Sequence, residues 1–150
     1  MKYFFALLLL SSLTANAQTE EEAVKTPIKA LFDGMRKADT ALMRSAFASN
    51  AILQTITKSK EGKVGVKTES LDGFIASIAT VKEGALDERI KYDEIKVDAD
   101  LAIAWTPYQF YYKSAFSHCG VNSFQLVRID GQWKIQYLID TRRKQGCDGL

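Results

Sequence analysis

The chain has 150 residues, and its 20 Lys and Arg against 18 Asp and Glu give a formal net charge of +2. Hydrophobic residues make up 47% and charged residues 25%, a composition that predicts one folded domain with a real core and excludes a long disordered chain. The balanced charge argues against a dedicated nucleic-acid binder, because phosphate recognition needs a clustered cationic surface.

The first 17 residues have the pattern of a secretory signal peptide. Met1-Lys2 gives a positive start, Tyr3 to Leu10 is an apolar run, and Ala15-Asn16-Ala17 is the small-x-small motif that signal peptidase cleaves. A membrane-spanning helix needs about 20 apolar residues, so the run is too short for a retained anchor. We therefore expect a signal peptide over 1–17, a single domain over 18–150, a secreted or periplasmic protein, and no membrane anchor after cleavage.

The mature chain should begin with a helix. Its apolar stripe consists of Val24, Ile28, Leu31, Phe32 and Met35. Pro27 is tolerated only in the first turn of a helix, so either the helix begins at Thr26 or it is kinked at the proline.

Two more helices and one strand should follow before the middle of the chain. Asp39 is the expected N-cap of a short helix over 40–48, and a strand over 51–57 comes next. The polar segment 58–68 is expected to be an exposed loop or a weak hairpin. A third helix begins near Ser70.

The second half of the chain has the pattern of a long antiparallel meander. Strands are expected over 89–97, 101–112, 116–129 and 132–141. The apolar parity flips near Asp93-Glu94, which predicts a bulge, and Pro107 predicts a second bulge or an edge segment. Asp130-Gly131 is a strong hairpin turn.

These elements predict an α+β fold, in which three N-terminal helices pack on a strongly curved, mainly antiparallel sheet. Both faces of the meander carry apolar side chains, and the helices can cover only one. The second face therefore needs a partner, or it wraps around a ligand cavity. A homodimer through the sheet is the simplest solution.

Cys119 and Cys147 are the two cysteines of the chain. An exported protein meets oxidising conditions, so we expect one disulfide between them in preference to two free thiols. A metal site is not expected, because two thiols and the single imidazole fall short of a tetrahedral ligand set.

The chain resembles the nuclear transport factor 2-like superfamily in its exported bacterial branch, where the SnoaL-like and lumazine-binding-like groups are most similar. The likeness is carried by Ala38-Asp39, by 98–102, and above all by the C-terminal segments 118–121, 124–128 and 130–135. The resemblance implies a cone-shaped α+β barrel whose helices close the wide end around a pocket, and frequent dimers. Members of this superfamily range from isomerases, dehydratases and cyclases to binding modules, and its enzymes usually work without cofactors.

Standard catalytic motifs are missing from the sequence. The candidate catalytic residues are His118, Asp140 and Tyr108, with Tyr111 and Tyr112 as further phenols. His118 could act as a base oriented by Asp140, with a tyrosine polarising a carbonyl oxygen. The alternatives are a histidine in the pocket wall and an aspartate paired with a basic neighbour such as Arg142 or Arg143.

Three further patterns restrict the chemistry. Cys119 cannot serve as a nucleophile for His118, since adjacent strand residues face opposite sides. The isomerase-like pattern has a tyrosine on the first helix, where this chain has Phe32. The basic cluster 142–144 is expected to be a solvated tail.

Three functions remain open. The first is an exported binding module with an aromatic pocket for a small, partly apolar or aromatic ligand, without a complete catalytic set or cofactor. The second is a dimeric envelope protein with a vestigial cavity, and the third is a cofactor-free lyase, isomerase or hydrolase that uses His118 and Asp140. The candidate ligand-binding residues are Phe32, Phe47, Trp105, Tyr108, Phe110, Tyr112, His118, Asn122 and Phe124.

Overall fold

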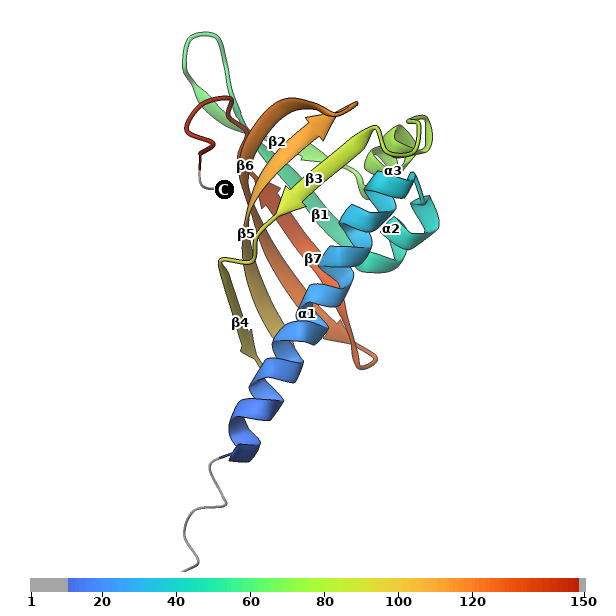
Figure 1. Ribbon diagram of the computed structural model, residues 1–150, viewed down its shortest axis with the longest axis vertical. Helices are drawn as coiled ribbons and strands as arrows, with labels where there is room; N and C mark the ends of the chain where they lie inside the picture. Colours follow the sequence, from blue (N-terminus) through green and yellow to red (C-terminus); the bar gives the residue numbers. More distant parts are fainter. Residues whose placement is uncertain (1–10, 149–150) are drawn as a thin grey trace, which may run out of the picture.

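Three helices cover one face of a curved, seven-stranded sheet (Figure 1). The structure is a computed structural model that describes residues 11–148, with side chains from Glu20 onward. The elements are α1 (Ser11–Lys37), α2 (Thr40–Ala46), β1 (Phe47–Lys58), β2 (Val64–Glu69), α3 (Leu71–Ala79), β3 (Leu86–Ile90), β4 (Glu94–Asp98), β5 (Leu101–Tyr112), β6 (Ala115–Ile129) and β7 (Gln132–Asp140). The α+β class and the helix-covered curved sheet expected from the sequence are confirmed.

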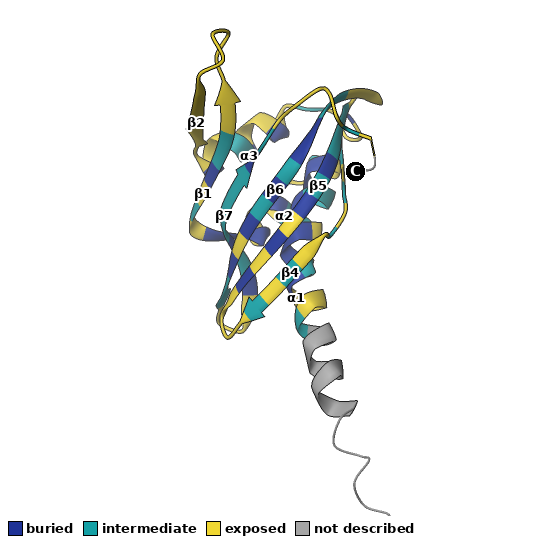
Figure 2. Ribbon diagram, turned by 90° about the vertical axis from the view of Figure 1, so that its left-hand side faces the viewer, coloured by how far each residue is buried: buried dark blue, intermediate teal, exposed yellow. Residues whose placement is uncertain are grey.

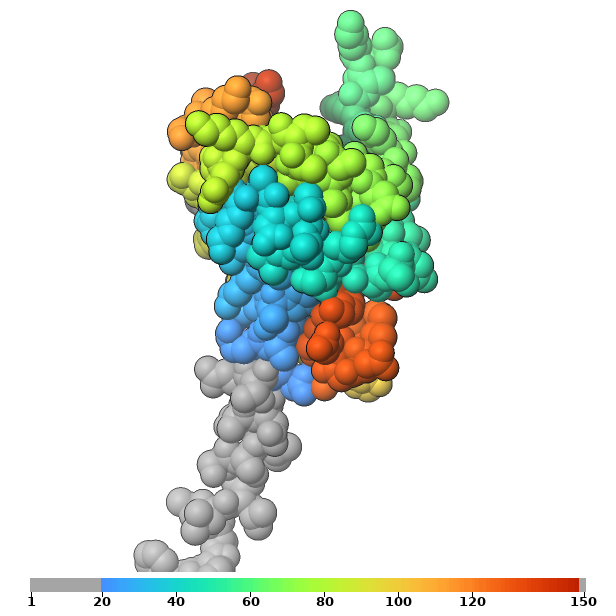
Figure 3. Space-filling model, turned by 90° about the vertical axis from the view of Figure 1, so that its right-hand side faces the viewer, coloured from blue at the N-terminus to red at the C-terminus, as the bar shows by residue number. Residues whose placement is uncertain are grey.

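The sheet has the strand order β2-β1-β7-β6-β5-β3, and β4 also pairs with β5. All neighbours are antiparallel except β1 and β7, which run parallel. The expected strand over 51–57 is longer, and the segment 58–68 contains a second strand that forms a hairpin with it. This hairpin projects beyond the helices, which cover the sheet in the view of Figure 3.

Helix α1 begins before Pro27 and continues through it. The alternative in which the helix begins at Thr26 is therefore wrong. Val24 and Ile28 on either side of the proline are fully buried, and Pro27 is itself buried. Packing of this stripe on the sheet therefore outweighs the hydrogen bond that proline removes. Residues 1–10 of the expected signal peptide lie outside the described residues and 11–17 form the start of α1, so the cleavage site stays a prediction.

The expected strand over 89–97 is two strands, and both pair with β5. The break lies opposite Pro107, whose carbonyl accepts a hydrogen bond from the backbone N–H of Lys91 at 2.9 Å. Proline has no N–H to return, so the regular ladder stops there. The irregularity predicted for this region is therefore present, and it comes from the proline.

The core lies between the helices and the concave face of the sheet. Its largest fully buried side chains include Ile28 and Leu31 of α1, Phe124 and Leu126 of β6, and Ile135 of β7. Alternate residues of β5 point into this core, and those between them point out, as Figure 2 shows by the alternating colours along that strand. The opposite, convex face is left with exposed apolar side chains.

Candidate functional site

A pocket of about 180 Å³ lies between α1, α3 and the concave face of the sheet. Its apolar lining consists of Leu31, Phe32, Met35, Leu53, Phe74, Ile78, Leu86, Phe110 and Leu138. Its polar lining consists of Gln54, Thr55, Glu69, Glu88, Tyr108, His118, Asn122, Asp140 and Arg142. The pocket thus combines an apolar wall with a cluster of titratable groups.

Glu88 projects from β3 into this pocket. Leu86, Glu88 and Ile90 are two residues apart, so all three side chains lie on the core-facing side of the strand. Oε1 of Glu88 accepts a hydrogen bond from Nδ2 of Asn122 at 2.8 Å. The pKa of Glu88 is raised to about 7. Burial is the largest cause and the negative charge of Asp140 adds to it, while the hydrogen bond from Asn122 and the charge of Arg142 act in the opposite direction. Near neutral pH, Glu88 therefore exchanges between its neutral and charged forms.

Asp140 lies at the end of β7 and is only 8% exposed. Its Oδ2 accepts a hydrogen bond from Nε of Arg142 at 2.8 Å and a longer one from the Tyr108 hydroxyl at 3.3 Å. The same hydroxyl also donates to the carbonyl of Thr141 at 2.9 Å. Burial raises the pKa of Tyr108, and the charge of Asp140 adds to this, so the phenol stays protonated. The pairing of Asp140 with Arg142 neutralises one of the two carboxylates.

His118 forms part of the pocket wall on β6. Its ring packs edge-on to Tyr108 and tilted against Phe110, with centroid distances of 5.7 and 5.0 Å. Nδ1 lies 3.0 Å from the Ser117 hydroxyl. Burial lowers the pKa of His118, and the positive charge of Arg142 adds to this, so the ring is neutral at pH 7. Among residues 20–148, no hydrogen bond joins His118 to Asp140.

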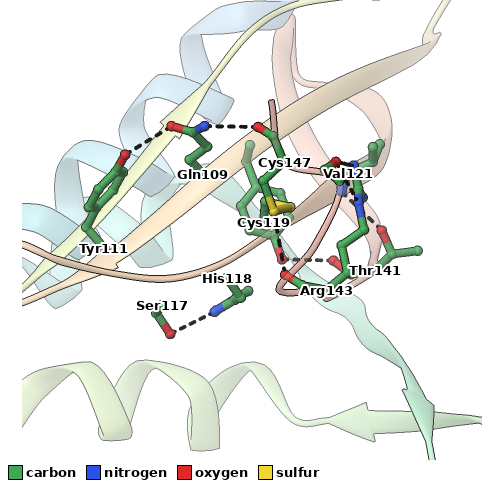
Figure 4. The surroundings of a disulfide bond; sticks show 11 residues. Gln109, Tyr111, Ser117, His118, Cys119, Val121, Thr141, Arg143 and Cys147 are labelled. Carbon is green, nitrogen blue, oxygen red and sulfur yellow. Dashed lines mark hydrogen bonds between the residues drawn. A yellow bond between two sulfur atoms is a disulfide. The ribbon is translucent and has the colours of Figure 1, made fainter. Parts of the chain in front are cut away.

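The segment after β7 is held against β6 and is not a free tail (Figure 4). Cys119 and Cys147 form the expected disulfide, with their Cα atoms 5.8 Å apart. Cys119 and Arg143 also exchange two backbone hydrogen bonds of 2.8 Å. This arrangement places Arg142 at the edge of the pocket, where its Nη2 donates to Thr55 at 3.3 Å. The Arg142 side chain is still 55% exposed, so the expected solvation of this basic segment is present, but the segment is held in place and does not hang free.

Gly120 allows this close approach. A Cβ on this residue would lie 1.8 Å from the backbone oxygen of Thr141 and 2.8 Å from Cε1 of Tyr108. Real Cβ atoms never approach so closely, so any larger residue would push the strand away from the segment that carries Arg142. The glycine thus supports the geometry of the polar end of the pocket.

Several side chains proposed from the sequence meet in the pocket. They are Phe32, Tyr108, Phe110, His118, Asn122 and Asp140. Phe47 and Phe124 lie in the core instead, and Trp105 and Tyr112 are each 45% exposed. The alternation along β5 puts Trp105 on the convex face, opposite Tyr108. Tyr111 contacts the guanidinium of Arg89, 4.1 Å from its ring centroid.

Glu88 and Arg142 are the site residues that sequence reasoning missed. Glu88 preceded the expected start of its strand at residue 89, although its spacing between Leu86 and Ile90 was the available signal. The sequence predicted Arg142 only as a partner for Asp140 or as part of a solvated basic tail, because nothing local indicated that the chain returns along β6. Within the described chain, no group of three or more His, Cys, Asp or Glu side chains is arranged to hold a metal ion.

No helix in the described part of the chain is both long and apolar enough to cross a membrane.

Comparisons with known proteins give a family and a fold. A family model described as putative lumazine-binding matches residues 19–137. A nuclear transport factor 2-like protein of unknown function from Shewanella baltica has a TM-score of 0.67 at 20% identity, over 85% of this chain and 97% of that chain. A putative dehydratase of the same superfamily from Streptomyces avermitilis has a TM-score of 0.61 at 13% identity, over 85% and 98%. A search of curated proteins finds no match.

Removing the disulfide should destabilise the protein and loosen the segment that carries Arg142. The bond closes a loop with a sequence separation of 28, and loops of this size are worth about 3 to 4 kcal/mol in the chain-entropy model. We expect reduction, or replacement of both Cys119 and Cys147 by Ala, to lower the free energy of unfolding in urea by that amount. The double variant is its own control, since reductant should no longer affect it. Equal urea midpoints for the reduced and oxidised protein would contradict this role.

Proposed function

Because the chain belongs to the putative lumazine-binding family of the nuclear transport factor 2-like superfamily, we propose that it is a small-molecule-binding domain whose ligand occupies the pocket between α1, α3 and the sheet. The observation that carries this proposal is the pairing of an apolar, aromatic wall with convergent polar groups at one end of the same cavity. Ligand sites in proteins have this composition, in which the apolar wall provides affinity and a few polar groups fix orientation.

The size of the pocket restricts the ligand. A dry cavity of about 150 Å³ accepts benzene, and sites for drug-sized molecules begin at about 300 Å³. At about 180 Å³, this pocket suits a molecule of one or two rings. A bicyclic heteroaromatic compound such as lumazine, which the family description mentions, is at the upper end of this range.

The contacts favour binding over catalysis. A catalytic pair of His118 and Asp140 would need Asp140 to orient the imidazole. Asp140 instead accepts hydrogen bonds from Arg142 and Tyr108, and Nδ1 of His118 lies against Ser117. The cofactor-free lyase, isomerase or hydrolase therefore has weaker support than the binding module.

We also propose that the protein is exported. The signal-peptide pattern of residues 1–17 and the disulfide between Cys119 and Cys147 both favour a secreted or periplasmic location.

The binding proposal is tested by titrating the protein with lumazine and with single-ring aromatic compounds. We expect saturable binding by calorimetry and a rise in the melting temperature. Phe110→Ala removes part of the aromatic wall and should weaken binding by about tenfold or more, since a buried aromatic side chain contributes roughly 1.5–3 kcal/mol.

The matched control is Phe116→Ala, since Phe116 lies on the neighbouring strand but is 45% exposed and outside the pocket lining. The Phe116→Ala variant should bind each compound with the same affinity as the unaltered protein. Failure of every compound to bind, or an equal loss in both variants, would contradict the proposed site.

A self-association surface is the second part of the proposal. The strand register places Ile103, Gln125, Tyr137 and Ile52 in one row across the convex face. Ile52, Ile103 and the neighbouring Trp105 are 47%, 38% and 45% exposed. An apolar strip of this kind, interrupted by the exposed Gln125, is a typical interface, and a two-fold pairing of identical faces covers it.

We expect a dimer by sedimentation and light scattering. Trp105→Glu should shift the protein to monomer, because it places a charge beside Ile103 at the β5 end of the apolar strip. Phe116→Glu changes an equally exposed aromatic residue at the opposite end of the β5–β6 pair, where it packs on Tyr111, and should leave the dimer intact. A monomer at all concentrations would remove the interface.

A further inference from the structure

The charges that line the pocket do not balance. Three carboxyl groups face it: Glu88 from β3, Asp140 from β7 and Glu69 from the end of β2. Arg142 is the only Lys or Arg among the lining residues, and its Nε is already bound to Asp140. His118 cannot supply a second positive charge at neutral pH, because burial lowers its pKa. The pocket therefore has an excess of negative charge.

Glu88 is the carboxyl group on which this excess acts most strongly. Asn122 donates to its Oε1, and in the described chain neither an ion pair nor a hydrogen bond to Oε2 is present. A buried carboxylate without a cation is unfavourable, and such groups either take up a proton or acquire a positive partner. One half of the Glu88 carboxylate is thus available to a ligand.

The walls next to Glu88 suit the same kind of ligand. Phe110 pairs with Glu88 across β3 and β5, so both lie at the same level of the sheet. Phe32 lies on the helix side of the pocket. Aromatic faces attract cations as well as apolar groups, so these rings can accept either a charged nitrogen or the ring that carries it.

We propose that the ligand carries a positively charged nitrogen group, such as an amine or an amidine, which binds the free oxygen of Glu88 while its apolar part packs against Phe32 and Phe110. This inference rests on the proposed function and names the ligand class for the same pocket. An anionic ligand would face two uncompensated carboxyl groups and a guanidinium that is already paired. A neutral ligand would leave Glu88 without a positively charged partner.

The pH dependence of binding follows from the pKa of Glu88, which is about 7. A cation binds the ionised form, so affinity should fall about tenfold between pH 8 and pH 6 as Glu88 takes up a proton. Binding at pH 7 should release a proton to the buffer. The titratable groups around Glu88 are Asp140 and Arg142 at the end of the sheet, Glu69 at β2, His118 on β6 and Tyr108 on β5. Of these, Arg142 and Tyr108 keep their charge state across this range, since the pKa of each is raised.

The test compares three single-ring probes of nearly the same shape: benzamidine, which is cationic, benzamide, which is neutral, and benzoate, which is anionic. In calorimetry at pH 8, the affinity for benzamidine should exceed the affinities for benzamide and benzoate by about tenfold or more. Repeating the titration at pH 6, and in buffers of different ionisation enthalpy, should show the weaker binding and the released proton.

Glu88→Gln keeps an acceptor for Asn122 and removes the charge. It should weaken benzamidine binding about tenfold or more, remove the pH dependence, and leave benzamide binding unchanged. The matched control is Glu94→Gln, which removes an exposed carboxylate on β4 that pairs with Lys96 outside the pocket. The ranking of the three probes and the pH profile of the unaltered protein test the proposal even if Glu88→Gln folds poorly.

The outcomes separate the two proposals. Benzamide or benzoate binding as tightly as benzamidine would overturn the cation preference and leave the pocket as a ligand site. An affinity for benzamidine that is equal at pH 6 and pH 8 would also overturn the cation preference and leave the pocket as a ligand site. Absence of binding by all three probes and by lumazine would overturn both the cation preference and the proposed function.

Discussion

Two carboxyl groups, the buried Asp140 and the half-buried Glu88, line the same pocket, and the cost of removing them from water governs the surrounding structure. For Asp140, the ion pair with Arg142 and the hydrogen bond from the Tyr108 hydroxyl offset this cost. Glu88 has only the amide of Asn122, and its raised pKa is the consequence. The difference between these two environments gives the pocket its chemical character.

The features around the C-terminus serve this arrangement. Arg142 belongs to a segment that lies outside the sheet, so its position depends on the disulfide from Cys147 to β6 and on the two hydrogen bonds between Cys119 and Arg143. Gly120 lets that segment approach, because its missing side chain leaves room for the backbone of Thr141. A stabilising crosslink and a small residue thus act together to bring a guanidinium to a buried carboxylate.

The sequence predicted the parts of this architecture that depend on local patterns. The turn at Asp130-Gly131, the N-cap at Asp39 and the interruption at Pro107 all depend on the chemistry of single residues, and all are present. The alternation along β5 predicts that Tyr108 and Trp105 lie on opposite faces of the sheet, but it does not show which face is concave. Both residues were therefore candidates for the pocket. The spacing of Glu88 between Leu86 and Ile90 was a usable signal, but it required the strand to begin before residue 89. The position of Arg142 could not be predicted, since it depends on how the chain returns after β7.

The most direct test is a carbon-13 NMR titration of the Glu88 side-chain carboxyl, assigned by its loss in Glu88→Gln. The ligand-free protein should give a midpoint of about pH 7, well above the ordinary value of 4.5, because burial raises the pKa of Glu88. A midpoint near 4.5 would mean that water or a cation already compensates this carboxylate. The poorly compensated carboxylate from which the ligand class is inferred would then not exist.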